Sequence, residues 1–425
     1  MSRARSRADK SEVLKRRQGA IEGMLAPSAA LDVDDCAYHV NLDELEAAAE
    51  ALFRAFPYSS LHALKVEAAL CPAVFQQALG GRFGARVERP EELSLALARC
   101  APERVVAGGG FRDAASLERC LEAGVQIVID SLQELRWLEG LLGPGGQPPG
   151  AVLLGVNVAW ALPTPPGAPT FTGIDVQADR LALLSAFKRR SWLRGLALSA
   201  SPSWSVPSTA AAVGALVELA GQIEQQGGRV AVLDLGDCQS TTPEEDEDPP
   251  VQALIDQLAT AAPELMLGVL KGRWRLQTGV GAGLFDRPTS LVSRVASTRR
   301  LGNQNHAWCG APGGATAQEV LVHTPTGGLK RGAYSWWSLH GPGPAAPDLL
   351  ARAYLPPIAP GDLVWMNGLP CPAPCPAAVR PAVYGGRSAE PTLALLEARG
   401  SSRPSRQAAA SSTIPSNSPS STETT

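Results

Sequence analysis

The chain has 425 residues, of which 45% are hydrophobic, enough for two ordinary domains or for one large barrel with an appended domain. Its 38 lysines and arginines nearly balance its 41 aspartates and glutamates, which argues against nucleic acid as the main partner. No apolar stretch approaches the length of a transmembrane helix and no signal-peptide pattern occurs, so we expect a soluble, cytoplasmic protein without membrane contact.

The two ends of the chain differ in composition from the middle. Residues 1–30 form a polar extension that is basic at first, and residues 400–425 are mostly serine, proline and threonine, which predicts a disordered tail. Asp9 and Glu12 interrupt the basic run, which favours a solvated extension, with organelle import as the alternative. Eight scattered cysteines indicate reduced thiols, and the close pair Cys371 and Cys375 lacks further metal ligands nearby.

From about residue 37 the pattern alternates between short apolar runs and helical segments. A strand at 37–40 precedes a helix that we expect from Asn41 to about Phe56, with Asn41 as its cap and Glu44 three residues later. The strands expected next are 61–65, 84–87, 104–107, 126–129, 151–157, 193–198, 228–234 and 265–270. The helices expected between them are 72–80, 90–99, 113–123, 131–141, 176–190, 208–227 and 250–262, with Asp113 and Ser131 as caps.

Eight strands followed by helices predict an α/β protein with a (β/α)8 barrel of the TIM type, over residues 31–274. A doubly wound open sheet is the alternative. After residue 275, glycine, proline and short β-type runs such as 320–323, 333–337 and 362–365 replace the helical pattern. They predict a β-domain over residues 275–399, completed by part of residues 31–45.

Lys65 ends the first barrel strand, Leu61-His62-Ala63-Leu64-Lys65. A lysine at a strand end usually lies there because the chain meets water. The carboxyl ends of barrel strands, however, are where active sites of this architecture lie, so Lys65 is a candidate catalytic residue. The acidic run Glu244-Glu245-Asp246-Glu247-Asp248 follows the seventh strand at the same barrel end, and a solvated loop is its favoured interpretation.

This arrangement resembles the pyridoxal-phosphate-dependent decarboxylases that act on diaminopimelate, ornithine and arginine, whose barrel is of the alanine-racemase type. The resemblance covers roughly residues 35–370 and is slightly closer to the diaminopimelate branch. Its local matches are 62–65, 92–93, 121–125, 130–135, 173–175, 232–236 and 355–362. The resemblance implies a homodimer and a Schiff base between Lys65 and pyridoxal 5'-phosphate, with cofactor contacts at Ser199, Gly236, Gly272 and Arg273.

The chain departs from the family at the positions that carry chemistry. The ring-stacking histidine is replaced in Ser199-Ala200-Ser201-Pro202, and only the first glycine of the phosphate loop remains in Gly236-Asp237-Cys238. The glutamate that faces the pyridine nitrogen is absent from the run at 270–273, which keeps Gly272 and Arg273. The catalytic cysteine and aspartate are absent from 341–346, and the phosphate-binding tyrosine is absent from 367–370.

Three hypotheses follow, and enzyme status stays open among them. The chain is a decarboxylase with altered chemistry, or a non-catalytic relative, or a relic that retains the dimer without a ligand. The non-catalytic relative is similar in logic to the antizyme inhibitors and binds a related decarboxylase or a regulatory protein. The missing cysteine, glutamate and histidine should leave little decarboxylation, because positioned acid–base groups each contribute about 10²–10⁴-fold to the rate. Under the last two hypotheses we expect pyridoxal phosphate to be bound weakly or lost.

Overall fold

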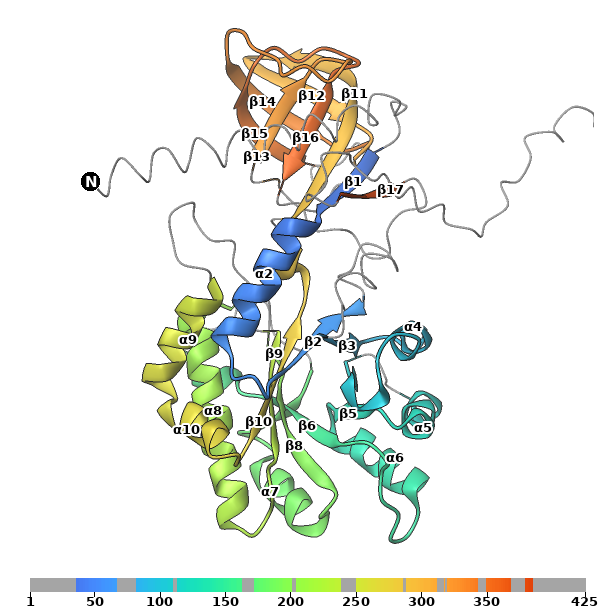
Figure 1. The fold of residues 1–425 in the computed structure, drawn as a ribbon, viewed down its shortest axis with the longest axis vertical. Helices are drawn as coiled ribbons and strands as arrows, with labels where there is room; N and C mark the ends of the chain where they lie inside the picture. Colours follow the sequence, from blue (N-terminus) through green and yellow to red (C-terminus); the bar gives the residue numbers. More distant parts are fainter. Residues whose placement is uncertain are drawn as a thin grey trace, which may run out of the picture. The chain divides into compact units, whose positions relative to one another are not determined.

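The computed structural model describes a parallel barrel and a β-domain (Figure 1). The described residues are 36–66, 82–109, 113–162, 172–200, 204–237, 250–285, 288–311, 317, 319–342, 349–367 and 379–384. The predicted helix at 72–80, both terminal extensions and the acidic run at 244–248 lie outside these residues.

The described barrel strands are all parallel and close into a ring of eight, because β5 pairs with β6 and β10 pairs with β2. They are β2 (Leu61–Lys65), β3 (Gly84–Val87), β4 (Val105–Ala107), β5 (Gln126–Ile129), β6 (Val152–Asn157), β8 (Leu193–Leu198), β9 (Val232–Asp237) and β10 (Arg275–Val280). The two-residue strand β7 (Ile174–Asp175) adds to β6 outside the ring. This closure confirms the predicted barrel and contradicts the open-sheet alternative.

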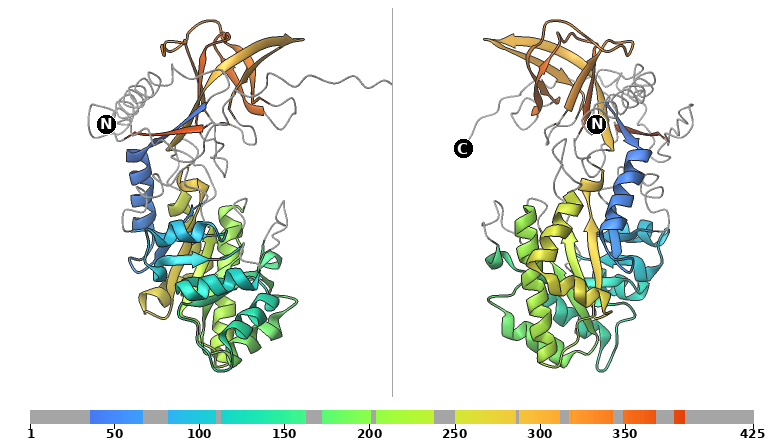
Figure 2. Two further views of the ribbon diagram at one scale, coloured as in Figure 1. Left: turned by 90° about the vertical axis from the view of Figure 1, so that its right-hand side faces the viewer. Right: turned by 60° about the vertical axis from the view of Figure 1, so that its left-hand side comes forward.

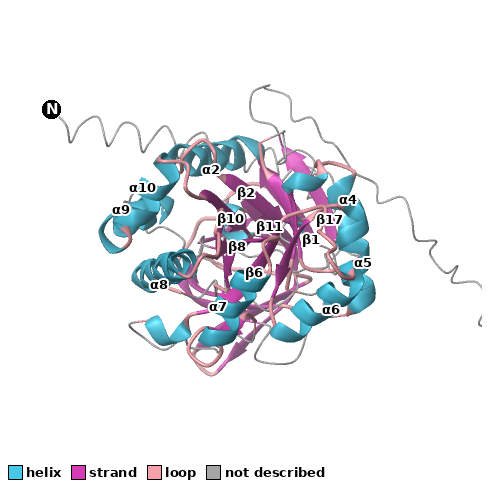
Figure 3. Cartoon of the chain, turned by 90° about the horizontal axis from the view of Figure 1, so that it is seen from below, coloured by secondary structure: helices cyan, strands magenta, loops and turns pink. Residues whose placement is uncertain are grey.

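Helices surround the strands of the barrel (Figure 3). They are α2 (Leu42–Ala55), α4 (Glu92–Leu97), α5 (Ala114–Ala123), α6 (Leu132–Leu142), α7 (Arg180–Arg189), α8 (Val206–Gln225), α9 (Pro250–Ala261) and α10 (Pro263–Leu270). The predicted caps are confirmed: Asn41, Asp113 and Ser131 accept hydrogen bonds from the backbone N–H groups three residues later. Helix α8 is long and apolar enough to cross a membrane, but 56% of its apolar window is buried within the protein, as in a core helix.

The eighth strand is not where the sequence predicts it. Residues 265–270 lie in helix α10, which begins at Pro263. The barrel closes with β10 instead, so the barrel extends past the expected boundary at residue 274. A short apolar run does not distinguish a strand from a buried helix, and proline favours the first turn of a helix. The exposure pattern is helical, since Leu265 and Val269 are buried whereas Leu267 and Leu270 are 54% and 75% exposed.

Strand alternation fills the barrel interior in layers. One apolar cluster inside the ring contains Leu61, Ala63, Val106, Val128, Leu153, Ala197 and Val232. A second and larger cluster includes the side chains between the strands and the helices. Because side chains alternate along a strand, the position two residues after an interior residue also faces the interior. In β2 and β9 those side chains are Lys65 and Asp234.

The β-domain is one mixed sheet in the described part of the chain. Its strands are β11 (Thr289–Leu301), β12 (Gln304–Cys309), β13 (Glu319–His323), β14 (Ser335–His340), β15 (Leu349–Leu355), β16 (Leu363–Asn367) and β17 (Val379–Tyr384). The strand that precedes the barrel, β1 (Cys36–Asn41), also belongs to it: β1 pairs antiparallel with β11 and parallel with β17 (Figure 2). The barrel is therefore an insertion in the β-domain.

Candidate functional site

Lys65 lies at the carboxyl end of β2 and faces the barrel interior. It shares this face with Leu61 and Ala63, which belong to the interior apolar cluster. Its side chain is 18% exposed. The strand therefore supports the lysine from below and leaves its amine at the end of the barrel where the parallel strands finish.

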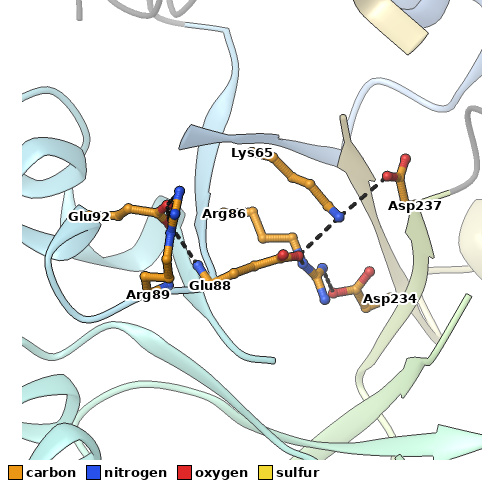
Figure 4. Close-up of polar contacts among 7 residues, drawn as sticks. All are labelled: Lys65, Arg86, Glu88, Arg89, Glu92, Asp234 and Asp237. Atoms are coloured by element: carbon orange, nitrogen blue, oxygen red, sulfur yellow. Dashed lines mark hydrogen bonds and ion pairs between the residues drawn. The ribbon is translucent and has the colours of Figure 1, made fainter. Parts of the chain in front are cut away.

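Two carboxylates hold the amine of Lys65 (Figure 4). Its Nζ lies 3.0 Å from Glu88 Oε1 and 3.4 Å from Asp237 Oδ2. Burial alone would lower the pKa of Lys65, but the charges of Glu88 and Asp237 outweigh burial, so the pKa lies above its ordinary value. Lys65 is therefore held as an ammonium ion near neutral pH.

Glu88 is fixed by the turn that follows β3. Glu92, in the first turn of α4, accepts hydrogen bonds at Oε2 from the backbone N–H of Glu88, at 2.9 Å, and of Arg89, at 3.3 Å. The Arg89 guanidinium donates to the other oxygen of Glu92 at 2.8 Å. Glu92 is 7% exposed, so this arrangement holds the turn and aims the Glu88 carboxylate toward Lys65 (Figure 4).

Asp237 faces the interior because the alternation of β9 is broken at Gly236. Gly236 has a φ of 67°, in the left-handed region that favours glycine, and the pairing of β9 with β10 shifts register at this point. Asp234 and Asp237 thereby both point inward. Burial raises the pKa of Asp237, which the charges of Lys65 and Arg86 only partly offset, and its buried Oδ1 has no hydrogen-bond partner among the described residues.

A second ion pair lies beside the first. Arg86 Nη1 donates to Asp234 Oδ2 at 2.9 Å, and Gln277 Nε2 donates to the same oxygen at 2.9 Å. The backbone N–H of Gly236 donates to Asp234 Oδ1 at 2.9 Å. Burial lowers the pKa of Arg86, but Asp234 and Glu88 outweigh it and the pKa is raised. The carboxylate of Asp234 is thus fully buried and satisfied by three donors.

These groups border a cavity of about 410 Å³, a volume suited to a small molecule. Its lining contains three cationic side chains, Lys65, Arg86 and Arg89, and three carboxylates, Glu88, Asp130 and Asp237. The other lining residues are small or apolar: Gly109, Val128, Gly155, Thr172, Ala197, Leu198, Ser199, Ala200 and Gly236. Every cation of this set lies within 3.0 Å of a carboxylate: Lys65 pairs with Glu88, whereas Arg86 and Arg89 pair with Asp234 and Glu92, which are not part of the lining.

The structure brings together three of the five predicted site residues. Lys65, Ser199 and Gly236 line the cavity. Gly272 and Arg273 lie elsewhere, because the run that was expected to follow the eighth strand precedes it, between α10 and β10. There Arg273 Nε donates to Glu224 at 2.9 Å and its guanidinium stacks 4.1 Å from the ring of Trp274. Their placement after the eighth strand was therefore wrong.

Sequence reasoning missed two charged residues near Lys65, one on the second strand and one in the turn that follows it. Arg86 and Glu88 were not singled out, although Gly84-Ala85-Arg86-Val87 places a charge within a strand that is otherwise buried. A charged residue inside a buried parallel strand signals an interior ion pair. The family departures at 201–202, 238, 343–346 and 368–370 lie outside the described residues. Among the described residues, no group of three or more His, Cys, Asp or Glu side chains could hold a metal.

Solved structures share this architecture at low sequence identity. No family model and no curated protein matches the chain. Diaminopimelate decarboxylase from Helicobacter pylori, complexed with L-lysine, has a TM-score of 0.65 at 16% identity, covering 79% of this chain and 86% of that one. Arginine decarboxylase from Paramecium bursaria Chlorella virus has a TM-score of 0.64 at 14% identity, covering 79% of this chain and 90% of that one. Lysine/ornithine decarboxylase from Vibrio vulnificus, complexed with putrescine, has a TM-score of 0.62 at 16% identity, covering 78% of this chain and 88% of that one. The chain therefore has the fold of the diaminopimelate, arginine and lysine/ornithine decarboxylases, an alanine-racemase-like barrel with a β-domain.

Proposed function

We propose that this protein is a non-catalytic relative of the amino-acid decarboxylases that binds a small amine-bearing molecule in the barrel cavity. The observation that carries the proposal is the double ion pair of Lys65 with Glu88 and Asp237, at 3.0 and 3.4 Å. A lysine forms a Schiff base only as a neutral amine. Because two carboxylates raise the pKa of Lys65, the reactive form is scarce at neutral pH.

The cavity does not fit pyridoxal phosphate. A phosphate dianion needs cations or backbone N–H groups that face it. In the described lining, Arg86 is paired with Asp234, Arg89 with Glu92, and Lys65 with Glu88. Asp237 adds a carboxylate directly after Gly236, and its unsatisfied Oδ1 calls for a hydrogen-bond donor rather than an anion. We therefore assign the cavity no step of cofactor chemistry.

An amine-bearing ligand suits the same features. A primary ammonium group has three N–H donors and no acceptor. It could satisfy Asp237 Oδ1 and share the carboxylates of Glu88 and Asp130 with the cations already present. The structures of the same fold include complexes with L-lysine, agmatine and putrescine, all of which carry amino groups. We propose compounds of this class as ligands.

A cofactor-dependent decarboxylase with altered chemistry is the second candidate, because Lys65 ends the first barrel strand inside a cavity. An absorption spectrum with excess pyridoxal phosphate separates the two. The non-catalytic proposal predicts no band at ~420 nm, the usual aldimine position, no borohydride-stable adduct on Lys65, and no carbon dioxide from diaminopimelate, lysine, ornithine or arginine. A band that forms in the wild type and vanishes in Lys65→Met, but not in the exposed control Lys271→Met, would overturn the proposal.

Ligand binding is tested by calorimetry with L-lysine, putrescine and agmatine in turn. We expect at least one of them to bind, and Asp237→Asn to weaken that binding by at least tenfold, since a charged hydrogen-bond acceptor is lost. Asp179→Asn is the matched control, because Asp179 is exposed and makes no cap hydrogen bond. If none of the three binds, or if both variants bind equally well, the amine part of the proposal is wrong.

A further inference from the structure

One face of the β-domain sheet carries aromatic rings and arginines that are exposed or half-exposed among the described residues. The strand registers place Arg299 opposite His306, Trp308 opposite His340, and Trp336 opposite Tyr354. Paired residues point to the same side of a sheet, so these side chains share one face. We call it the aromatic–arginine face and define it by Arg299, His306, Trp308, Trp336, Arg352 and Tyr354.

Two rings of this face, and a third beside it, are exposed. Trp336 is 57% exposed and Tyr354 58%, and Tyr334, whose ring lies 5.8 Å from that of Tyr354, is 49% exposed. The alternate residues of the same strands, such as Trp337 and Leu339, are buried in the core. Neighbouring exposed aromatic side chains mark interaction sites more often than scattered ones do.

The charge of this face is positive. Arg352 lies 6.0 Å from the ring of Trp336 and Arg299 lies 5.8 Å from the ring of Trp308, and neither has an ion pair with a described residue. The registers of β11, β12, β14 and β15 put no aspartate or glutamate beside them on this side. Two such faces packed together would oppose arginine to arginine, so an acidic partner suits this face better than a second copy of the same face.

The chain itself contains an acidic segment with suitable chemistry. Residues 243–250 read Pro-Glu-Glu-Asp-Glu-Asp-Pro-Pro, five consecutive carboxylates with proline on both sides. Guanidinium groups bind carboxylates through paired hydrogen bonds, and proline-rich segments dock on surfaces lined with aromatic rings. Such a segment therefore complements both components of the face, whereas a purely acidic segment would complement the arginines alone.

We propose that the aromatic–arginine face binds the acidic segment 243–250 of a second copy of this chain. In a twofold dimer the contact occurs twice, since each copy offers one face and one segment. The second contact then forms at high effective concentration, so two modest contacts suffice for a stable dimer. The proposal goes beyond the barrel cavity and does not depend on what binds there.

The test uses the full chain and two complementary variants. The first carries Arg299→Glu and Arg352→Glu, and the second replaces each of residues 244–248 by lysine. Sedimentation velocity should show a wild-type dimer at low ionic strength. Its dissociation constant should be at least tenfold lower in 0.1 M than in 0.5 M salt. Each variant alone should be monomeric at the concentrations where the wild type is dimeric. An equimolar mixture of the two variants should restore association.

The matched control reverses two other exposed arginines, Arg99→Glu and Arg136→Glu, which lie on the barrel, and it should leave the dimer intact. Trp336→Ala should weaken association without charge reversal and with unchanged circular dichroism. A wild type that stays monomeric at both ionic strengths overturns the proposal. So does a dimer that tolerates the arginine reversals, or a mixture that fails to associate, as expected if the segment binds within its own chain.

Discussion

Arg86 Nη1 lies 2.9 Å from Asp234 Oδ2, and this hydrogen-bonded ion pair joins the second strand of the barrel to the seventh across its interior. The side chain of Asp234 is 0% exposed and that of Arg86 is 12% exposed. A buried ion pair is not by itself a large source of stability, because both charges lose their hydration. Removing one partner is costly, however, since it leaves the other charge buried and unpaired.

Arg86→Met should therefore lower the free energy of unfolding by about 3–5 kcal/mol. Urea titration followed by circular dichroism measures it. The double variant Arg86→Met with Asp234→Asn should recover part of the loss, because no charge remains unpaired. A double variant less stable than Arg86→Met would contradict this account of the pair.

The reactivity of Lys65 should depend on its two carboxylates. An amine reacts with an acylating reagent only when neutral, and the pKa of Lys65 is raised by Glu88 and Asp237 against the effect of burial. The midpoint for acylation of Lys65, followed by mass spectrometry of its peptide, should lie above the ordinary lysine value of ~10.4. It should fall in Glu88→Gln with Asp237→Asn, where burial and the charge of Arg86, which both lower the pKa, are no longer opposed by these carboxylates. Lys271, which is exposed, is the internal control.

His62 should make the protein sensitive to acid. Its ring is buried, accepts or donates a 2.8 Å hydrogen bond with Thr278, and packs against Phe53 and Phe56. Burial, with the charge of Arg82, lowers the pKa of His62 from 6.5 to about 4. The free energy of unfolding therefore has its full value above pH 6.5 and decreases as the pH falls toward about 4, because the unfolded chain takes up the proton first.

The size of this effect is on the order of 3 kcal/mol over the full range, from the pKa difference. Urea unfolding at pH 7 and pH 4.5 measures it. The stability difference between these two pH values should be smaller in His62→Gln than in the wild type. An equal difference in both proteins would show that other groups cause the acid sensitivity.

Two glycines test the bulge that turns Asp237 inward. Gly236 and Gly272 have nearly the same φ, 67° and 69°, so alanine is strained at both by about 1–2 kcal/mol. A Cβ at Gly272 would meet open space, whereas one at Gly236 would collide with the carbonyl oxygen of Leu198 and approach Ala200. Gly236→Ala should therefore destabilise the protein by at least ~2 kcal/mol more than Gly272→Ala in the same urea titration. Equal losses would contradict the close packing described at Gly236.

The strands that could be predicted from the sequence are those buried on both sides by apolar residues. Gln126-Ile127-Val128-Ile129 is such a run, and β5 begins and ends where expected. The last strand, β10, escaped prediction because it buries polar groups that are satisfied by distant partners. Gln277 donates to Asp234 and Thr278 bonds to His62, and neither contact can be read from the local pattern.

The candidate site, too, could be predicted from the sequence only in part. The inward position of Lys65 follows from strand periodicity and could be predicted. Its contacts could not, because Glu88 lies beyond the end of β3 in a turn that Glu92 holds, and Asp237 faces the interior only through the left-handed conformation of Gly236. Both depend on three-dimensional contacts that a one-dimensional pattern does not contain.

The pairing of β1 with β11 has a consequence for the order in which the protein is made. A ribosome releases β1 about 250 residues before the strand that it pairs with, since β1 ends at Asn41 and β11 begins at Thr289. The barrel strands lie between them, and the ring can close only once β10 is made, shortly before β11. Throughout that time β1 has an unpaired edge, and its side chains Cys36, Tyr38 and Val40, which are buried in the folded protein, lack their β11 neighbours. Synthesis thus passes through a period in which this strand is complete but has no β11 to pair with.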